Sequence, residues 1–496
     1  MRSALVVGSG FGGIASALRL RALGLDVHVI ERQEDVGGRA KVFECDGYRH
    51  DAGPTVITAP FLFDELFELF GERREDHIEF RELTPWYRFV FPDGDQFNYG
   101  GTLDDTLAEI GRIEPKDIDG YKSLVQHSKA MFDIGFSKLA HQPFHDIKTM
   151  AKQIPHLAKL RSDRSVWDMV CKYLSNDKIR QAFSIQPLLV GGSPFDTTSI
   201  YGLIHYLERA YGIYFAMGGT GALVEQLKQL MLRQGITIQT GVTVSEILTS
   251  NKKVQGVRLD SGDVISADFV VFNGDPMYLY RELLPQSSIP FTTRIKRDYS
   301  KLSMGLYVLF FGTDKQYPEI AHHTIWMGKR YRELLDDIFH RQILADDFSL
   351  YLHRPTATDP SFAPEGHDSF YVLAPVPHQG GGIDWDVEEP KLRARIIDAL
   401  DKTILPGLTE HIRAPFSMTP DSFATDYLSY QGAGFSIAPL FTQSAWFRFH
   451  NKAEGFENLF LAGAGTHPGA GMPGVISSAK VVEHLVKERI AKPAFV

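Results

Sequence analysis

Glycines near the beginning of the chain have the spacing of a phosphate-binding loop. An apolar run at residues 4–7 is followed directly by Gly8, Gly10 and Gly13, and residues 14–24 have a helical pattern. In such a unit the first glycine permits the tight turn, the second lets the backbone approach a pyrophosphate, and the third lets helix and strand pack closely. Free N–H groups at the helix N-terminus then face the phosphates. The pattern predicts a dinucleotide site; the alternative is a glycine-rich turn without a ligand.

An acidic residue lies where the ribose of a dinucleotide would be. A second apolar run, residues 27–30, ends in Glu31, at the distance of about 20 residues that is typical of a ribose-binding carboxylate. The carboxylate can accept hydrogen bonds from ribose hydroxyls, and it would repel a 2′-phosphate. The sequence therefore disfavours NADP.

Further glycine-rich segments indicate a cofactor longer than NAD. Residues 37–39 read Gly-Gly-Arg, and the arginine can neutralise a pyrophosphate through charge-assisted hydrogen bonds, although a solvated surface arginine is the alternative. Residues 51–55 predict a second close approach of the backbone. Near the far end, a strand-like run at 458–463 enters a glycine-rich loop, and a helix begins near Gly474. This second loop suits the flavin ring of an extended FAD.

The cofactor contacts predicted from these segments include Val244, whose backbone can face the adenine, and Asp275, in a loop at the cofactor edge. The full set is Gly8, Gly10, Phe11, Gly12, Gly13, Glu31, Arg32, Gly37, Gly38, Arg39, Gly53, Pro54, Thr55, Val244, Asp275, Gly463, Ala464, Gly465, Gly474, Val475 and Ile476.

These motifs together resemble those of the bacterial-type phytoene desaturases, a family of FAD-dependent enzymes that form carotenoids. The run at 458–472, with Ser478 after it, matches the family signature, and residues 8–13, 37–39 and 51–58 also match. The similarity extends over nearly the whole length. Two positions depart from it, since the family often has proline where Ala216 and Phe449 stand. These departures affect the details of substrate fit.

The resemblance implies desaturation of a linear carotene, such as phytoene, to more conjugated products such as neurosporene or lycopene. The implied path is hydride transfer to flavin N5 with proton loss from the neighbouring carbon. A strong base is not required, because the allylic charge spreads over the polyene. Thr466 and His467 are flavin-side candidates by position, with a structural hydrogen bond as the alternative for His467. Oxygen and a quinone are both open as the electron acceptor.

Other functions stay open at this point. A flavoprotein of this type can isomerise or saturate a polyene, or oxidise an amine. A prenyl-binding protein of the Rab escort type has the same architecture without catalysis, but the intact glycine loops disfavour it. No metal site is expected, since no Cys/His cluster with ligand spacing is present and the two cysteines, Cys45 and Cys171, stand alone.

Composition limits the partners. The net charge of −9 argues against a nucleic-acid partner. No apolar run approaches the roughly 20 residues of a membrane-spanning helix. Residues 135–164 interleave apolar side chains with Lys148, Lys152 and Lys159, which suits an anionic membrane surface; an ordinary solvated helix pair is the alternative. We expect a peripheral protein on the cytoplasmic side of the cell membrane.

The sequence predicts an α/β protein with a discontinuous Rossmann-like domain. Residues 80–99 predict a hairpin around Asp93 and Gly94, within a mixed-sheet substrate domain. The predicted parts are an FAD-binding domain at 1–70, 212–290 and 455–496, a substrate domain at 71–119 and 291–454, and a helical subdomain at 120–211 that can contact a membrane.

Overall fold

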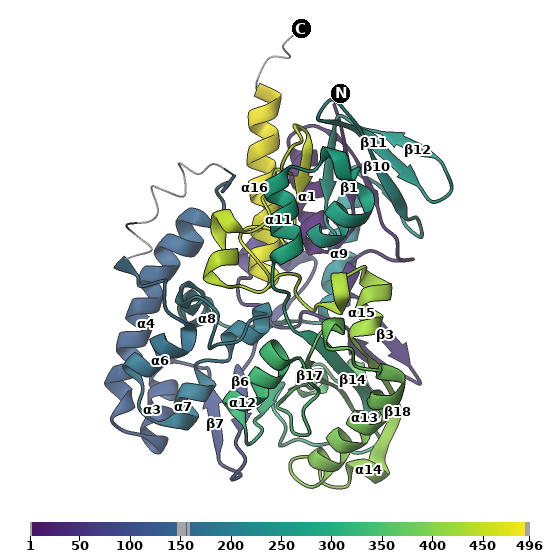
Figure 1. Cartoon of the computed structure of the whole chain (residues 1–496). Coiled ribbons are helices and arrows are strands. Elements are labelled where there is room, and N and C mark those ends of the chain that lie inside the picture. Colours follow the sequence, from purple (N-terminus) through teal and green to yellow (C-terminus); the bar gives the residue numbers. More distant parts are fainter. Residues whose placement is uncertain (1, 146–154, 156–158, 492–496) are drawn as a thin grey trace.

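A five-stranded parallel sheet forms the core of the upper half of the molecule (Figure 1). The computed structural model describes residues 2–145, 155 and 159–491. Strands in such a sheet are buried on both faces, which explains why they read as unbroken apolar runs. The strand order is β19 (Leu459–Leu461), β13 (Phe269–Phe272), β1 (Ser3–Val7), β2 (Asp26–Ile30) and β9 (Thr237–Gln239). The predicted α/β class is confirmed, and the last segment supplies an edge strand.

Three long helices pack on this sheet. They are α1 (Phe11–Ala22), α9 (Gly219–Arg233) and α16 (Met472–Ala491). Their buried side chains and those of β1, β2 and β13 form one apolar cluster. A three-stranded antiparallel sheet of β10 (Val244–Ser250), β11 (Lys253–Leu259) and β12 (Val264–Ser266) lies beside it.

A seven-stranded mixed sheet lies in the lower half (Figure 1). Its order is β18 (Ile412–Met418), β14 (Gly305–Thr313), β17 (Asp368–Val376), β16 (Leu350–His353), β15 (His323–Trp326), β6 (Tyr87–Val90) and β7 (Gln96–Tyr99). Every residue of β14 is buried, because α13 (Trp385–Asp401) packs on one face of the sheet and a second apolar cluster lies on the other. The hairpin at 80–99 is narrower than predicted: β6 and β7 form it, while β5 (Phe80–Glu82) pairs with β8 (Tyr214–Ala216).

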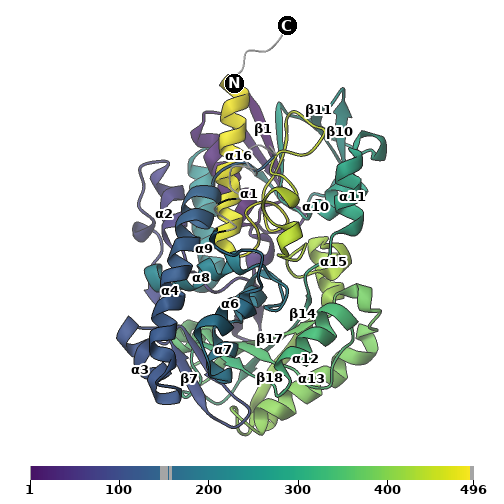
Figure 2. The same ribbon diagram turned by 60° about the vertical axis from the view of Figure 1, so that its left-hand side comes forward.

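Helices gather on the side of the molecule that Figure 2 brings forward. They are α3 (Leu103–Ile113), α4 (Asp117–Ile134), α6 (Val166–Tyr173), α7 (Asp177–Ala182) and α8 (Leu203–Tyr211), with a π-helical turn at Gly135–Leu139 after α4. Thr102 and Asp105 form a capping box that fixes the start of α3. Among residues 2–145 and 159–491, no helix combines the length and apolarity needed to cross a bilayer.

Shorter elements connect these parts. They are α2 (Phe61–Glu68), α10 (Pro276–Tyr278), α11 (Phe291–Tyr299), α12 (Tyr331–Asp336), α14 (Leu408–His411), α15 (Pro420–Tyr427), β3 (Val42–Cys45) and β4 (Tyr48–Asp51). The division into three domains stays a prediction. Strands from both segments assigned to the substrate domain form the seven-stranded sheet. Helix α11 belongs to the same predicted domain but contacts the loop at 448–454 through hydrogen bonds of Lys296.

Candidate active site

A cavity of ≈ 640 Å³ extends between the parallel sheet and the seven-stranded sheet. One end is lined by the loops that follow β1, β2, β13 and β19, and the other by the helical side and the seven-stranded sheet. Binding clefts of α/β sheets lie at the carboxyl ends of the strands, where these loops are found. The two ends differ in chemistry and are described in turn.

The loop after β1 has the close packing of a pyrophosphate-binding loop, because side chains at its glycine positions would collide with neighbouring atoms. A Cβ on Gly13 would lie 2.0 Å from the carbonyl oxygen of Gly8, and one on Gly12 would lie 2.5 Å from Asn273 Nδ2. Helix α1 begins after Gly10 with no side-chain cap and no acid in its first turn. Its first N–H groups are therefore available to an anion in the cavity.

Glu31 directly follows β2, lines the cavity wall and is buried. Its Oε2 accepts hydrogen bonds from Ser9 N (2.8 Å) and Ser9 Oγ (2.6 Å), and its Oε1 accepts one from Gln33 N (2.9 Å). The carboxylate thus holds the glycine loop to the end of β2. An ionised carboxylate offers about four acceptor positions, so acceptor capacity remains for a ribose hydroxyl.

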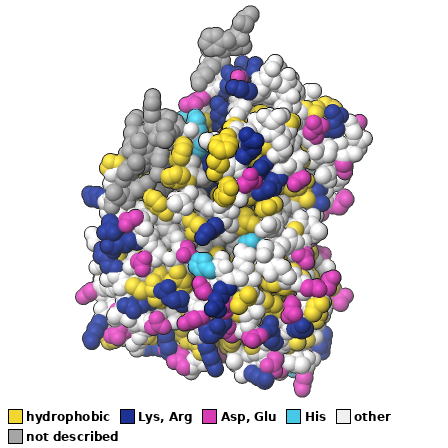
Figure 3. Space-filling view, viewed as in Figure 1, with side chains coloured by type: hydrophobic (Ala, Val, Ile, Leu, Met, Phe, Trp, Pro, Cys, Tyr) yellow, Lys and Arg dark blue, Asp and Glu magenta, His cyan; other side chains and the backbone are white. Residues whose placement is uncertain are grey.

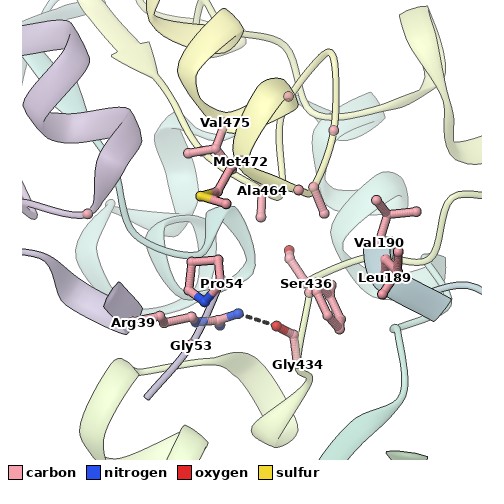
Figure 4. Close-up of a pocket in the computed structure, with 18 of the residues that line it drawn as sticks. Arg39, Gly53, Pro54, Leu189, Val190, Gly434, Ser436, Ala464, Met472 and Val475 are labelled. Atoms are coloured by element: carbon pink, nitrogen blue, oxygen red, sulfur yellow. Dashed lines mark hydrogen bonds between the residues drawn. The ribbon is translucent and has the colours of Figure 1, made fainter. Parts of the chain in front are cut away.

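Arg39 crosses the cavity rather than pointing into solvent (Figure 4). Its guanidinium donates hydrogen bonds to the carbonyl oxygen of Gly434 and to Ser429 Oγ, and it lies 5.7 Å from the ring centroid of Phe423. Burial lowers the pKa of Arg39 from its usual value. A Cβ on Gly53 would lie 2.0 Å from the Arg39 carbonyl oxygen, so the backbones of residues 39 and 53 pack closely; the approach of residues 51–55 to the cofactor stays a prediction.

The loop after β19 forms the opposite rim. Gly463 N donates to Ser478 Oγ (2.9 Å), and Asn273 Nδ2 donates to the Ala462 carbonyl oxygen (3.0 Å). Gly463 has a φ of +119°, which a residue with a side chain rarely adopts. Figure 4 shows Ala464, Met472 and Val475 on this rim, facing Pro54 and Arg39 across the opening. The first turn of α16 contains no acid.

Most of the predicted cofactor contacts lie along this cavity. The lining residues among them are Gly8, Gly10, Phe11, Glu31, Arg32, Gly37, Gly38, Arg39, Gly53, Pro54, Thr55, Val244, Asp275, Gly463, Ala464, Gly465, Gly474 and Val475. Gly12, Gly13 and Ile476 lie behind the wall, in helix packing. Asp275 caps α10 and accepts from Tyr430 N (3.0 Å) and Ser436 Oγ (2.8 Å), and Arg32 donates to the carbonyl oxygens of Thr425 and Asp426.

The two catalytic candidates differ in position. His467 lines the cavity, and its Nε2 bonds to the Leu139 carbonyl oxygen (2.9 Å). Burial lowers the pKa of His467 to about 4, so its imidazole is neutral and weakly basic at neutral pH. Thr466 is fully buried outside the lining, and its hydroxyl donates to the Gly463 carbonyl oxygen (2.9 Å). A catalytic role for either stays a prediction.

The other end of the cavity is almost wholly apolar. Its lining includes Phe136, Leu139, Phe144, Leu188, Leu189, Val190, Ile200, Leu203, Leu207, Met304, Leu306, Val308, Met327, Leu334 and Leu373. Glu208, on α8, is a carboxyl group in this region, and Tyr87 Oη donates to its Oε1 at 3.4 Å. Burial raises the pKa of Glu208 to about 8. The group is therefore largely protonated at neutral pH and adds little charge to the apolar wall.

Sequence reasoning placed the loop at 273–276 near the cofactor edge without singling out Asn273, and it missed Arg448. Asn273 directly follows β13 and lies under both glycine loops, near Gly12 and Gly463. Arg448 is buried and donates to the carbonyl oxygens of Ala464 (2.6 Å) and Thr466 (3.0 Å), which fixes the second loop from behind. Asn273 directly follows the apolar run of β13 in the sequence, and this position could have marked it as a site residue. A lone arginine such as Arg448 has no such feature in the sequence.

Comparison with known proteins identifies the family. The flavin containing amine oxidoreductase family matches residues 11–482. A phytoene desaturase (lycopene-forming) of Pantoea ananas is 44% identical over 98% of this chain and 99% of its own. The chain belongs to the bacterial phytoene desaturases. A second relative in this family, the phytoene desaturase (neurosporene-forming) of Rhodobacter capsulatus, is 39% identical over 98% of this chain and 94% of its own.

Solved structures agree on the fold. Putrescine oxidase bound to putrescine superposes with a TM-score of 0.66 at 14% identity, covering 99% of both chains. At this identity the likeness concerns the fold alone. The family and the fold establish this phytoene desaturase as an FAD-dependent oxidoreductase, in agreement with the cofactor predicted from the two glycine loops.

Proposed function

We propose that this chain desaturates a linear carotene, with phytoene as its substrate. The near-full-length identity of 44% to a lycopene-forming phytoene desaturase carries the proposal. The cavity supports it, since the uncapped start of α1 suits an anionic cofactor at one end and apolar side chains suit a hydrocarbon at the other. Relatives named as lycopene-forming and neurosporene-forming are similarly close, so the number of double bonds introduced stays open.

The residues of the chain have separate tasks in this reaction. The loops at Gly8–Gly13 and Gly463–Gly474 would hold the cofactor, and Glu31 would hold its ribose. When bound, FAD supplies the hydride acceptor at N5. The apolar wall excludes water and fixes the extended substrate, which places reacting atoms in one geometry. His467 and its bond to Leu139 would position the second loop against the helical side.

An assay with the flavin-loaded protein and phytoene in liposomes tests the proposal. We expect new conjugated absorption bands under air or with an added quinone, and product analysis gives the number of desaturation steps. Protein stripped of flavin is the control. Flavin-loaded protein that yields no conjugated product with either acceptor would contradict the desaturase proposal, and a product with unchanged hydrogen content would favour an isomerase.

We further propose that the protein contacts an anionic membrane through α11. Phe291, Ile295 and Tyr299 repeat every four residues along this helix and are 69%, 44% and 81% exposed. Arg294 is exposed between them, and Figure 3 shows apolar side chains next to Lys and Arg over this region. An apolar row beside an exposed cation suits the surface of an anionic bilayer.

The position of α11 supports a route for an apolar substrate. Lys296 Nζ donates to the Arg448 carbonyl oxygen (2.8 Å), and the neighbouring loop contributes Phe441 and Ala445 to the cavity lining. Phe441 is itself 43% exposed. The membrane-facing row is therefore close to a part of the cavity wall that reaches the surface.

The sequence predicted the membrane contact at residues 135–164, but the described apolar side chains of this segment point into the protein. Phe136, Leu139 and Phe144 are buried and line the cavity, so they are not available to a bilayer. Lys148 and Lys152 lie outside the described residues, and Lys159 is exposed.

Sedimentation with anionic liposomes separates the two surfaces. A triple variant, Phe291→Ser with Ile295→Ser and Tyr299→Ser, should lose most of its binding, while Leu232→Ser, at an exposed position elsewhere, should bind fully. Full sedimentation of the triple variant would contradict the α11 surface. Loss of binding on charge reversal at Lys148, Lys152 and Lys159 instead would place the contact at 135–164.

A further inference from the structure

Four buried polar side chains meet behind the cavity wall, where β4, β15 and β16 adjoin. Three form a histidine cluster, defined as His322, His323 and His353, in which one ring nitrogen from each lies within 4.8 Å of the others. His323 and His353 face each other across the β15–β16 pair. Asp51, at the end of β4, places its Oδ2 3.7 Å from His353 Nε2. No more than 4% of any of these residues is exposed.

No described residue satisfies the atoms that converge there. The Nε2 atoms of His322 and His323, both ring nitrogens of His353, and Asp51 Oδ2 all lack a hydrogen-bond partner. A buried polar group without a hydrogen-bond partner destabilises the folded state. A group of them at one point therefore favours a ligand that they share.

The Nδ1 atoms of His322 and His323 do have hydrogen-bond partners. His322 Nδ1 bonds to Thr358 Oγ1 (2.7 Å), and His323 Nδ1 bonds to Tyr351 Oη (2.7 Å). In the tautomer whose Nδ1 donates to this oxygen, the ring is fixed and Nε2 is the lone-pair donor, which is the usual arrangement around a metal-bound histidine.

We propose that the histidine cluster and Asp51 together bind one divalent transition-metal ion, for which zinc is the best match. Zinc takes imidazole nitrogens and carboxylate oxygens in four-coordinate sites at about 2.0–2.2 Å. The three imidazole nitrogens lie within 4.8 Å of one another, and Asp51 Oδ2 lies 3.7 Å from His353 Nε2. With four protein ligands the site is closed, which is typical of a structural ion.

The sequence offered no sign of this site. Its ligands come from residue 51 and from residues 322, 323 and 353, and only the strand pairing brings them together. None has the short spacing by which zinc sites are usually found in sequences. The expectation of no metal site rested on that missing spacing.

Such an ion would stabilise one wall of the cavity. Asp51 is followed closely by Gly53 and Thr55, which line it. Thr55 Oγ1 bonds to Tyr371 Oη (2.8 Å) and to Tyr351 Oη (3.1 Å), and Tyr351 is also the partner of His323. The ion would join the seven-stranded sheet to the segment that faces the cofactor, and this role does not depend on the identity of the carotene.

Metal analysis of the full-length holoprotein tests the proposal. The chain is purified without a polyhistidine tag, from medium supplemented with zinc, and dialysed against a weak chelator. We expect about one zinc ion per chain. Co²⁺ added to metal-depleted protein should give the visible absorption of four-coordinate cobalt, and X-ray absorption should show scattering from imidazole rings.

Variants locate the ion. His323→Gln combined with His353→Gln should lower the zinc content to less than about one-tenth of an ion per chain, because two ligands of four are lost. The matched control is His205→Gln, since His205 is also fully buried with both ring nitrogens unpartnered but lies outside the cluster. It should retain the ion.

Two results would overturn the proposal. The first is folded, flavin-containing wild-type protein that binds neither Zn²⁺ nor Co²⁺, which would mean that buried water satisfies the cluster. The second is a double variant that keeps its full metal content. If the double variant does not fold, the wild-type X-ray absorption decides, because coordination by oxygen alone would contradict a histidine site.

Discussion

The two ends of the cavity are built on different principles. At the cofactor end the wall is mostly backbone, and a single Cβ on Gly13 or Gly53 would come within 2.0 Å of a carbonyl oxygen. At the other end the wall is made of apolar side chains from the helical side and the seven-stranded sheet. Backbone cannot move aside for an added atom, whereas side chains can repack around a change of similar volume. The first end should therefore tolerate almost no substitution, and the second should tolerate conservative ones.

The largest effect is expected at the backbone end. Gly13→Val should abolish flavin binding, because its Cβ would collide with the Gly8 carbonyl oxygen, which lies in the loop itself. The flavin absorption of the purified protein measures this. Gly111→Ala is the control, since Gly111 lies within α3, outside the cavity lining, and its Cβ would meet only the flexible end of the Ile118 side chain, at 3.1 Å. Full flavin content in Gly13→Val would show that the loop is not the phosphate site.

A polar side chain at the apolar end should affect turnover without affecting the flavin. Leu189→Asn places an amide in the wall shown in Figure 4, and burying it without a partner costs roughly 2 kcal/mol or more. We expect carotene turnover to fall by at least about tenfold, while Leu189→Met stays close to wild type. Loss of flavin in Leu189→Asn would mean that a change at the apolar end of the cavity also disrupts flavin binding at the other end.

Glu208 should make stability depend on pH. Its pKa is raised by burial from 4.5 to about 8, so the folded state keeps a proton that the unfolded state releases. Stability is then highest below about pH 4.5 and falls as pH rises towards 8, by at most about 5 kcal/mol. The side chain in Glu208→Gln cannot ionise, so the melting temperature of this variant should increase relative to that of the wild type as pH rises. A constant difference across this range would contradict a buried, protonated Glu208.

The smallest effect is expected at His467. Its low pKa and its bond to the Leu139 carbonyl oxygen indicate a positioning role, so His467→Gln should lower turnover by less than about tenfold and leave the pH profile unchanged. A general base contributes about 10²–10⁴-fold. A loss of that size, with normal flavin content and a lost pH dependence, would make His467 the proton acceptor.

The cofactor end was largely predictable from the sequence, and the apolar end was not. A glycine loop carries its function in local spacing, so residues such as Gly8 and Gly463 could be predicted directly, and the structure places both on the wall of one cavity. The apolar wall consists of ordinary leucines, valines and phenylalanines, which the sequence cannot distinguish from core. Phe136 and Leu139 illustrate this, since they were interpreted as membrane-facing and are buried against the cavity. Glu208 and Arg448 depend on burial, which only the tertiary structure sets.

The late position of β19 has a consequence for how the protein is made. Strand β13 pairs with residues 459–461 on one side, and α16 follows directly. Until the ribosome has released these residues, β13 presents an open strand edge with an apolar sequence, and such edges promote association between chains. The nascent chain thus passes through a long aggregation-prone interval before it can load its flavin, and slower synthesis with chaperone support should improve the yield of coloured protein.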